Sequence, residues 1–216
     1  MEIDLLQRPP VKRIYSSSWR KQENREIAQR FDREFFDGDR VNGYGGYYYD
    51  GRWVAVAERI KHHYNLSNKS SFLDIGCAKG FLLHDIRTLL PEIKIAGLDI
   101  SAYAIENSIA DVRSFLSQGS ADSLPYEDHS FDFIFSVDTL HNLPPELCEK
   151  AFRELNRVCR PSGNIFVQVD AYKTPEEQKN MEAWSLTAKT HMYVYQWLNF
   201  FEKVDYRGDY FWTIMR

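Results

Sequence analysis

Two acidic residues and a glycine-rich turn are the first groups in this sequence with the types and spacing for ligand chemistry. The segment FLDIGCAKGFL passes from an apolar stretch through Asp74, Gly76 and Gly80 into a second apolar stretch. This order is typical of a strand that turns tightly into a helix, where the backbone approaches a ligand closely. Asp99 follows about 20 residues later, the spacing at which an acid binds the ribose of a nucleotide.

Three kinds of ligand use such a turn: a nucleotide phosphate, a dinucleotide and a sulfonium cofactor. A phosphate loop needs Ser or Thr directly after its lysine, but Lys79 is followed by Gly80. A dinucleotide remains an alternative, although the carboxylate of Asp74 would repel its pyrophosphate. The same carboxylate would attract a cofactor that carries an ammonium and a sulfonium group. Asp99 could bind the ribose of either cofactor. Asp74 is therefore the residue that distinguishes a sulfonium cofactor from a dinucleotide.

The elements that must position these residues alternate between strand and helix from residue 71 onward. The predicted strands cover residues 71–75, 93–100, 113–118, 131–137 and 164–170. The predicted helices between them cover residues 80–90, 102–112 and 144–163. This rhythm predicts a parallel sheet with helices on both faces. Asp122 follows the third strand at the carboxyl edge of the sheet, where its carboxylate would accept a hydrogen bond from an adenine amino group.

The two ends of the chain depart from this alternation. Residues 1–17 read as an irregular arm, residues 16–38 contain a helix, and residues 42–53 form a loop rich in glycine and tyrosine. Residues 174–201 are mostly helical, and two short strands around Gly208 and Asp209 predict an antiparallel hairpin, because their connection is too short for a parallel crossover. We therefore expect an arm and lid at 1–51 and an α/β domain at 52–216.

Composition narrows the function classes. The net charge of −4 over 216 residues is negative, so the chain as a whole has no electrostatic attraction for nucleic acid or an anionic membrane. No apolar run approaches the ~20 residues of a membrane helix. The three cysteines are odd in number and lack the spacing of a metal site, so we expect reduced thiols in a cytoplasmic protein without a metal.

Four features in order resemble those of the class I S-adenosylmethionine-dependent methyltransferases, over roughly residues 52–216. They are LDIGCAKG, GLDIS, the stretch ADSLPYEDHSFDFIFSVDTLHNL and the closing hairpin. The resemblance implies a three-layer, Rossmann-like α/β fold with a mainly parallel seven-stranded sheet and an antiparallel C-terminal hairpin. One departure is Ala78, which stands in place of the middle glycine and narrows the approach of the backbone to the cofactor.

The resemblance also implies that S-adenosylmethionine is the cofactor and S-adenosylhomocysteine the product. Carried over by position, the methionine end is held by Asp74 and the backbone of Gly76, Cys77, Ala78 and Gly80. Asp99 takes the ribose hydroxyls, with Ile100 against the adenine. Ala121 and Asp122 read the adenine edge, and Ser136 and Val137 line the floor under the methyl group.

The methyl acceptor needs groups of its own. His141 follows the fourth strand beside the expected methyl group, where an imidazole would take a proton from a hydroxyl or an amine. Asp138 and Asn142 share its loop and would orient a substrate. The loop before the domain would supply a lid, in which tyrosine hydroxyls bind the substrate and an arginine pairs with a carboxylate or phosphate. The lid residues are Tyr44, Tyr47, Tyr49 and Arg52. A packing arm is the alternative.

These observations predict a methyltransferase for a small polar metabolite, with oxygen favoured as the acceptor atom. A sugar or another intermediate of surface-polysaccharide or secondary metabolism suits the tyrosine-rich lid. Family members that methylate bases or glutamine carry Asn/Asp-Pro-Pro-aromatic after the fourth strand, whereas this chain reads VDTLHN. The alternatives are N- or C-methylation of a small molecule, an NAD-dependent oxidoreductase, and an inactive cofactor-binding partner subunit. We expect a monomer or homodimer that binds neither nucleic acid nor membrane.

Overall fold

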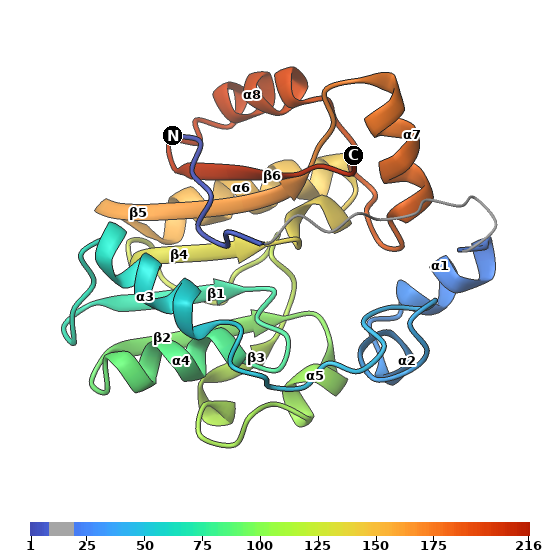
Figure 1. The fold of residues 1–216 in the computed structure, drawn as a ribbon. Helices are drawn as coiled ribbons and strands as arrows, with labels where there is room; N and C mark the ends of the chain where they lie inside the picture. Colours follow the sequence, from blue (N-terminus) through green and yellow to red (C-terminus); the bar gives the residue numbers. More distant parts are fainter. Residues whose placement is uncertain (9–19) are drawn as a thin grey trace.

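The centre of the molecule is a parallel sheet with the strand order β3-β2-β1-β4-β5-β6 (Figure 1). This computed structural model describes residues 1–8 and 20–216. The six strands of the described chain are β1 (Ser71–Ile75), β2 (Lys94–Asp99), β3 (Leu116–Gln118), β4 (Phe131–Val137), β5 (Cys159–Asp170) and β6 (Asp209–Thr213). The predicted strands 71–75 and 131–137 are confirmed to the residue. The order reverses between β1 and β4, which makes the ends of these two strands the switch point where ligands bind in such sheets.

Eight α-helices of the described chain connect and cover the strands. They are α1 (Gln22–Ala28), α2 (Arg33–Phe36), α3 (Val54–His63), α4 (Phe81–Leu89), α5 (Ala102–Glu106), α6 (Pro145–Val158), α7 (Pro175–Trp184) and α8 (Val194–Lys203). Two short 3₁₀ turns, η1 (Arg113–Phe115) and η2 (Leu140–Asn142), precede β3 and follow β4. The helices predicted between the strands are confirmed, although α5 and α6 each end several residues earlier than expected, and β5 already begins at Cys159.

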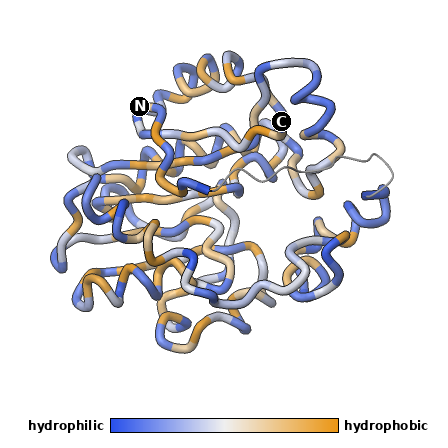
Figure 2. The backbone as a smooth tube through the Cα atoms, viewed as in Figure 1, coloured by the Kyte–Doolittle hydropathy of each residue, from blue (hydrophilic) through white to orange (hydrophobic). Residues whose placement is uncertain are grey.

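The core consists of two apolar layers, one on each face of the sheet. Successive side chains of a strand point to opposite faces, so Phe72 of β1 packs with α3 and α4, whereas Leu73 packs with α6 and α8. Phe152 of α6 and Trp197 of α8 are fully buried in the second layer. Figure 2 shows the corresponding apolar segments along the strands and the helices beside them. The three-layer α/β prediction is therefore confirmed.

The predicted C-terminal hairpin is wrong. Residues 209–213 form one strand, β6, which pairs in parallel with β5 from Phe166 opposite Asp209 to Asp170 opposite Thr213. The segment before Gly208 is the end of α8 and its turn, not a strand. Because α7 and α8 lie between β5 and β6, the connection is long enough for a parallel crossover. The described chain thus has six parallel strands instead of seven with an antiparallel edge.

The predicted N-terminal helix is two short helices. Phe31 adopts a left-handed backbone conformation (φ 50°) that ends α1, and the Asp32 side chain then caps α2 by accepting the Glu34 N–H. The start of the predicted helix, up to residue 19, lies outside the described residues, as does the part of the irregular arm from residue 9 onward.

Residues 1–8 belong to the α/β core. Glu2 pairs with Tyr210 along the outer edge of β6, and Leu5 and Leu6 are buried against α3 and its neighbours. The guanidinium of Arg59 on α3 donates to the backbone oxygens of Leu5 and Leu6. The beginning of the chain is therefore packed into the domain that we expected to start at residue 52. Within the described residues, no helix has the length and apolar character needed to cross a membrane.

Candidate active site

A cavity of about 1150 Å³ lies at the carboxyl ends of the parallel strands. Its walls include the turn after β1, the loop after β4, the segment 29–53 and the segment after α7. Fourteen of the residues singled out in the sequence line it: Tyr44, Tyr47, Arg52, Asp74, Gly76, Cys77, Ala78, Asp99, Ile100, Ala121, Val137, Asp138, His141 and Asn142. Residues distant in the sequence thus meet in one space, as the alternation of strands and helices predicts.

The glycine turn after β1 is held tightly against its neighbours. The backbone N–H groups of Gly76 and Cys77 both donate to Leu98 O of β2, at 2.8 and 3.2 Å. Gly76 has a φ of 80°, and a Cβ at this position would lie 1.9 Å from Thr139 Oγ1 of the loop after β4. Only glycine satisfies both conditions. The turn and the loop that follows β4 are therefore in direct contact at the switch point.

Asp74 and Asp99 lie on either side of this turn, and both are almost fully buried. Burial, with a further contribution from the nearby charge of Asp99, raises the pKa of Asp74 to about 8. Burial also raises the pKa of Asp99, although its carboxylate accepts the N–H groups of Ala78 and Ser101, each at 2.8 Å. A cation at Asp74 would compensate the buried carboxylate, which fits the ammonium group of a sulfonium cofactor.

The lysine of the glycine turn has a structural partner. Lys79 Nζ lies 2.6 Å from an Asp37 oxygen and also donates to Tyr47 O at 2.9 Å. Asp37 accepts two more hydrogen bonds, from the Tyr103 hydroxyl and the Tyr47 N–H. Asp37 was not recognised in the sequence, although a lysine inside a buried turn signals a need for a carboxylate partner. These contacts attach the tyrosine-rich segment to the turn.

Aromatic packing fixes the same segment over the cavity. The ring of Tyr47 stacks on Phe81 at the start of α4, with centroids 5.1 Å apart, and Tyr44 stacks on Phe36 at 5.8 Å. Tyr44 is 43% exposed as a residue, but desolvation of its hydroxyl and the nearby charge of Asp138 raise its pKa to about 12, so the hydroxyl keeps its proton. The guanidinium of Arg52 lines the cavity while it pairs with Asp50 at 2.7 Å.

Four predicted site residues do not line the cavity. The Tyr49 hydroxyl donates to Asp85 at 2.6 Å, and Asp122 bonds the Ser120 hydroxyl and lies 3.6 Å from Lys150 Nζ. Ser136 Oγ donates to Ile75 O, which ties β4 to β1. Gly80 is the N-cap residue of α4, with a φ of 77°. Intramolecular partners thus hold three of these side chains away from the cavity, and Gly80 serves the start of a helix.

The other end of the cavity is built from the ends of β4, β5 and β6. Asp138 follows β4, Asp170 ends β5, and Thr213 ends β6 opposite Asp170. Thr213 Oγ1 donates to Asp138 Oδ1 at 2.8 Å, and Arg8 Nη1 donates to Asp138 Oδ2 at 3.0 Å. Burial alone would raise the pKa of Asp138, but the positive charge of Arg8 and the proximity of His141 hold it below its ordinary value.

His141 lies in this end of the cavity as predicted, and it contacts Asp170 through both ring nitrogens. Its Nδ1 accepts the Asp170 backbone N–H at 3.0 Å, and its Nε2 lies 3.4 Å from Asp170 Oδ2. Burial raises the pKa of Asp170, and the negative charge of Asp138 adds to this effect. Asp170 was not recognised in the sequence. The available signal was its place as the last residue of the predicted strand 164–170, at the same edge as Asp138.

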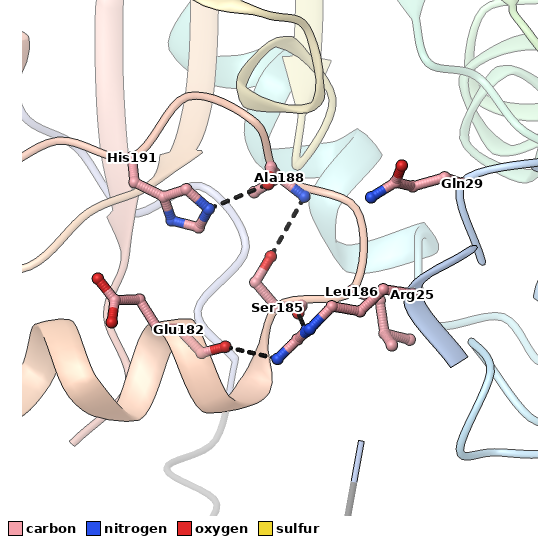
Figure 3. Close-up of a pocket in the computed structure, with 7 residues that line it drawn as sticks. All are labelled: Arg25, Gln29, Glu182, Ser185, Leu186, Ala188 and His191. Carbon is pink, nitrogen blue, oxygen red and sulfur yellow. Dashed lines mark hydrogen bonds between the residues drawn. The ribbon is translucent and has the colours of Figure 1, made fainter. Parts of the chain in front are cut away.

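The segment around α1 closes one side of the cavity by contacting α7. The guanidinium carbon of Arg20 lies 4.3 Å from the centre of the Trp184 ring, and that of Arg40 lies 5.5 Å from it. Figure 3 shows Arg25 of α1 reaching the end of α7, where its guanidinium donates to the backbone oxygens of Glu182 and Ser185 beside a hollow of about 180 Å³. Residues before the α/β domain and residues after β5 therefore form one wall.

Comparison with known proteins agrees with this architecture. Residues 73–167 match the methyltransferase domain family. The chain superposes on the YcgJ protein of Bacillus subtilis with a TM-score of 0.57 and 19% identity, over 68% of this chain and 66% of that one. It also superposes on a chain of the complex between the Haloferax volcanii Trm112 methyltransferase activator and its methyltransferase partner, with a TM-score of 0.54, 22% identity and 72% of each chain covered. At these identities the superpositions establish the fold.

Two curated relatives are methyltransferases by name. The malonyl-(acyl-carrier protein) O-methyltransferase of Hahella chejuensis is 30% identical over 96 residues, which are 43% of this chain and 34% of the relative. The demethylmenaquinone methyltransferase of Staphylococcus aureus is 25% identical over 150 residues, which are 67% of this chain and 59% of the relative. The chain thus spans between a third and three fifths of the length of these two relatives. Residues 73–167 therefore match a methyltransferase domain, and the fold of the chain and its cavity at the switch point agree with that match.

Proposed function

We propose that this protein transfers the methyl group of S-adenosylmethionine to an oxygen atom of a small polar molecule. The observation that carries the proposal is the single cavity of about 1150 Å³ that joins the glycine turn and Asp99 at one end to His141 and Asp170 at the other. Methyl transfer is an in-line displacement, so it requires donor and acceptor to be aligned in one enclosed space. A relative named as an O-methyltransferase favours oxygen as the acceptor atom.

The cofactor fits the half of the cavity formed by β1 and β2. Asp74 and the turn from Gly76 to Ala78 would hold the methionine end, and Asp99 would accept the ribose hydroxyls. Ile100 is half exposed and lines the cavity, as expected of a side chain that packs against an adenine ring. When bound, S-adenosylmethionine supplies an electrophilic methyl group next to a sulfonium. The protein then has to orient the acceptor, exclude water and accept one proton.

The acceptor fits the half of the cavity at the ends of β4, β5 and β6. Its polar groups include the carboxylates of Asp138 and Asp170 and the amide of Asn142, which can accept hydrogen bonds from the hydroxyl groups of a sugar or another polyhydroxylated metabolite. We propose that Asp138 and Asn142 orient this ligand, that the acceptor's proton is lost at the end of the cavity where His141 lies, and that Tyr44, Tyr47 and Arg52 cover the ligand. We further propose that the protein works in the cytoplasm on a free small molecule, as a monomer or homodimer.

Calorimetry followed by an acceptor screen tests the proposal. The protein should bind S-adenosylmethionine and S-adenosylhomocysteine, and NAD should give no binding heat. Incubation with methyl-labelled S-adenosylmethionine and a panel of sugars, hydroxy acids, phenols and amines should label a hydroxylated compound. Equal affinity for NAD would contradict the cofactor assignment. Labelling of amines alone would contradict transfer to oxygen, and cofactor binding without any labelled product would favour the inactive partner subunit.

A further inference from the structure

The ring of His141 has no nitrogen left to receive a proton from an acceptor. A backbone N–H only donates, so His141 Nδ1, which accepts the Asp170 N–H at 3.0 Å, must hold a lone pair rather than a proton. The neutral ring therefore carries its proton on Nε2, which points toward Asp170 Oδ2 at 3.4 Å. To act as a base, the imidazole would have to lose the hydrogen bond from the Asp170 backbone.

The carboxylate of Asp170 has the capacity that the ring lacks. A carboxylate accepts about four hydrogen bonds through its two oxygens. Among the described residues, the His141 ring provides the one close polar contact to it. Asp170 lines the same cavity as Asp74 and Asp99, and its side chain is only 11% exposed. Its position at the end of β5 is fixed by the backbone pairing of Asp170 with Thr213 and by the indole N–H of Trp197, which donates to Asp170 O at 3.0 Å.

We propose that Asp170 accepts the proton of the acceptor's hydroxyl and that His141 is a positioning residue, an inference that rests on the proposed function. The hydroxyl oxygen forms the new bond to the methyl carbon, and the carbon–sulfur bond breaks with its electron pair remaining on sulfur. The hydroxyl proton passes to an Asp170 oxygen and leaves to solvent after the product departs. His141 holds the carboxylate in place from both sides, through its Nδ1 to the backbone and its Nε2–H to the side chain.

The charges around Asp170 suit this role. His141, His191 and Arg8 stabilise the ionised carboxylate, whereas Asp138 and burial favour the protonated form and together raise the pKa of Asp170. Arg8 is itself paired with Asp138. A carboxylate with a raised pKa takes a proton from a hydroxyl more readily than an ordinary one. Asp138 is less suited to this task, because Arg8 and Thr213 already occupy its two oxygens.

Two substitutions separate the roles in the enzyme supplied with the hydroxylated acceptor from the screen. Asp170→Asn keeps the size of the side chain but removes the proton acceptor, so kcat should fall by ~10²–10⁴-fold and the ascending limb of its pH profile should disappear. His141→Gln can accept the Asp170 N–H and donate to its carboxylate, but it cannot take a proton. Its kcat should stay within about tenfold of the unmodified enzyme with the limb retained. A loss in His141→Gln as large as that in Asp170→Asn overturns the proposal.

A matched pair of residues and an acceptor-free measurement complete the test. His84 and Asp111 form a second histidine–aspartate contact of 2.7 Å outside the cavity, so His84→Gln and Asp111→Asn should leave kcat unchanged. All four variants should bind S-adenosylmethionine like the unmodified protein.

Long-range ¹H–¹⁵N spectra should show the His141 proton on Nε2 at neutral pH, and a proton on Nδ1 overturns the proposal. The spectra test the orientation of the His141 ring even when no acceptor is methylated. A failure to methylate any acceptor would count against the proposed function but not against this geometry.

Discussion

Lys79 Nζ lies 2.6 Å from the carboxylate of Asp37, and this ion pair joins the glycine turn to the segment that covers the cavity. The lysine side chain is 9% exposed and the aspartate side chain 28%. Asp37 also accepts hydrogen bonds from the Tyr103 hydroxyl and the Tyr47 N–H. One carboxylate therefore connects three parts of the chain, and its removal would leave a buried ammonium group.

Asp37→Ala should destabilise the protein and weaken cofactor binding. A buried charge that loses its partner costs about 3–5 kcal/mol, so we expect a loss near 3 kcal/mol for this partly buried pair. Urea unfolding measures the loss, and calorimetry measures the affinity for S-adenosylhomocysteine. Glu149→Ala, which removes the exposed pairs with Arg153 and Lys203, should cost much less, because solvent screens such pairs. Equal losses in the two variants would contradict the role of Asp37.

Asp74→Asn should make the protein more stable and a poorer binder. Folding raises the pKa of Asp74 from ~3.9 to about 8, so the folded chain binds more protons than the unfolded chain between these values. Its stability contribution therefore falls as the pH rises from about 4 to 8, and the amide removes that penalty. We expect a higher melting temperature for Asp74→Asn at pH 8 without cofactor. An equal or lower melting temperature would argue against a buried carboxyl with a raised pKa.

The same carboxyl predicts a pH-dependent affinity for the cofactor. The ammonium group of S-adenosylmethionine favours ionised Asp74, so binding below pH 8 should release about one proton. Calorimetry in two buffers of different ionisation enthalpy measures this release. Asp74→Asn has no carboxyl to ionise at this position, so it should release fewer protons on binding S-adenosylmethionine, and its affinity for the cofactor should be lower. Identical proton release in both proteins would place the titrating group elsewhere.

Asp99→Asn should weaken cofactor binding while the fold persists. The amide oxygen can still accept one of the two N–H groups that the Asp99 carboxylate now accepts, from Ala78 and Ser101. Charged hydrogen bonds to the ribose would be lost, so affinity should fall by roughly 1–3 kcal/mol, or about 5- to 150-fold. Asp111→Asn, in an exposed pair with His84, is the matched control and should bind normally. Unchanged affinity in Asp99→Asn would remove the ribose assignment.

Leu5→Ala should reveal how far the first residues support the core. Leu5 is 2% exposed and packs against the face of the sheet that α3 and α4 cover. Truncation of a buried leucine typically costs about 2–5 kcal/mol. Leu198 on α8 is 39% exposed, and Leu198→Ala should cost less than about 1 kcal/mol. Chemical denaturation of both variants makes the comparison, and equal stabilities would mean that the arm is only loosely attached.

The sequence alone was sufficient for the parallel body of the fold and for most of the cavity. Strands 71–75 and 131–137 are short apolar runs between clear turn signals, so their limits and their adjacent carboxyl ends could be predicted. Asp74, Asp99 and His141 consequently fell into one cavity. These predictions succeeded because each depends on local periodicity and on the rule that ligands bind at the carboxyl edge of such sheets.

The features that failed depend on contacts between distant segments. Gly208 and Asp209 resemble a hairpin turn, but the pairing of β6 is decided by the crossover through α7 and α8. Asp37 could not be assigned, because its partner Lys79 lies 42 residues away. The importance of Asp170 depends on the orientation of the His141 ring, and no sequence pattern specifies which hydrogen bond each ring nitrogen makes.

The placement of Trp184 gives the protein an optical signal for the state of its cavity. Trp184 lines the cavity, and the guanidinium carbons of Arg20 and Arg40 lie 4.3 and 5.5 Å from the centre of its ring. Cations over an indole ring interact with its π electrons, so a ligand that shifts either arginine changes the electric field on the ring and hence its fluorescence. Trp53 also lines the cavity, whereas Trp197 and Trp212 are buried in the core, so Trp184→Phe identifies the part of the signal that comes from Trp184. Ligand entry can therefore be followed in the unlabelled protein, on the timescale of the binding event itself.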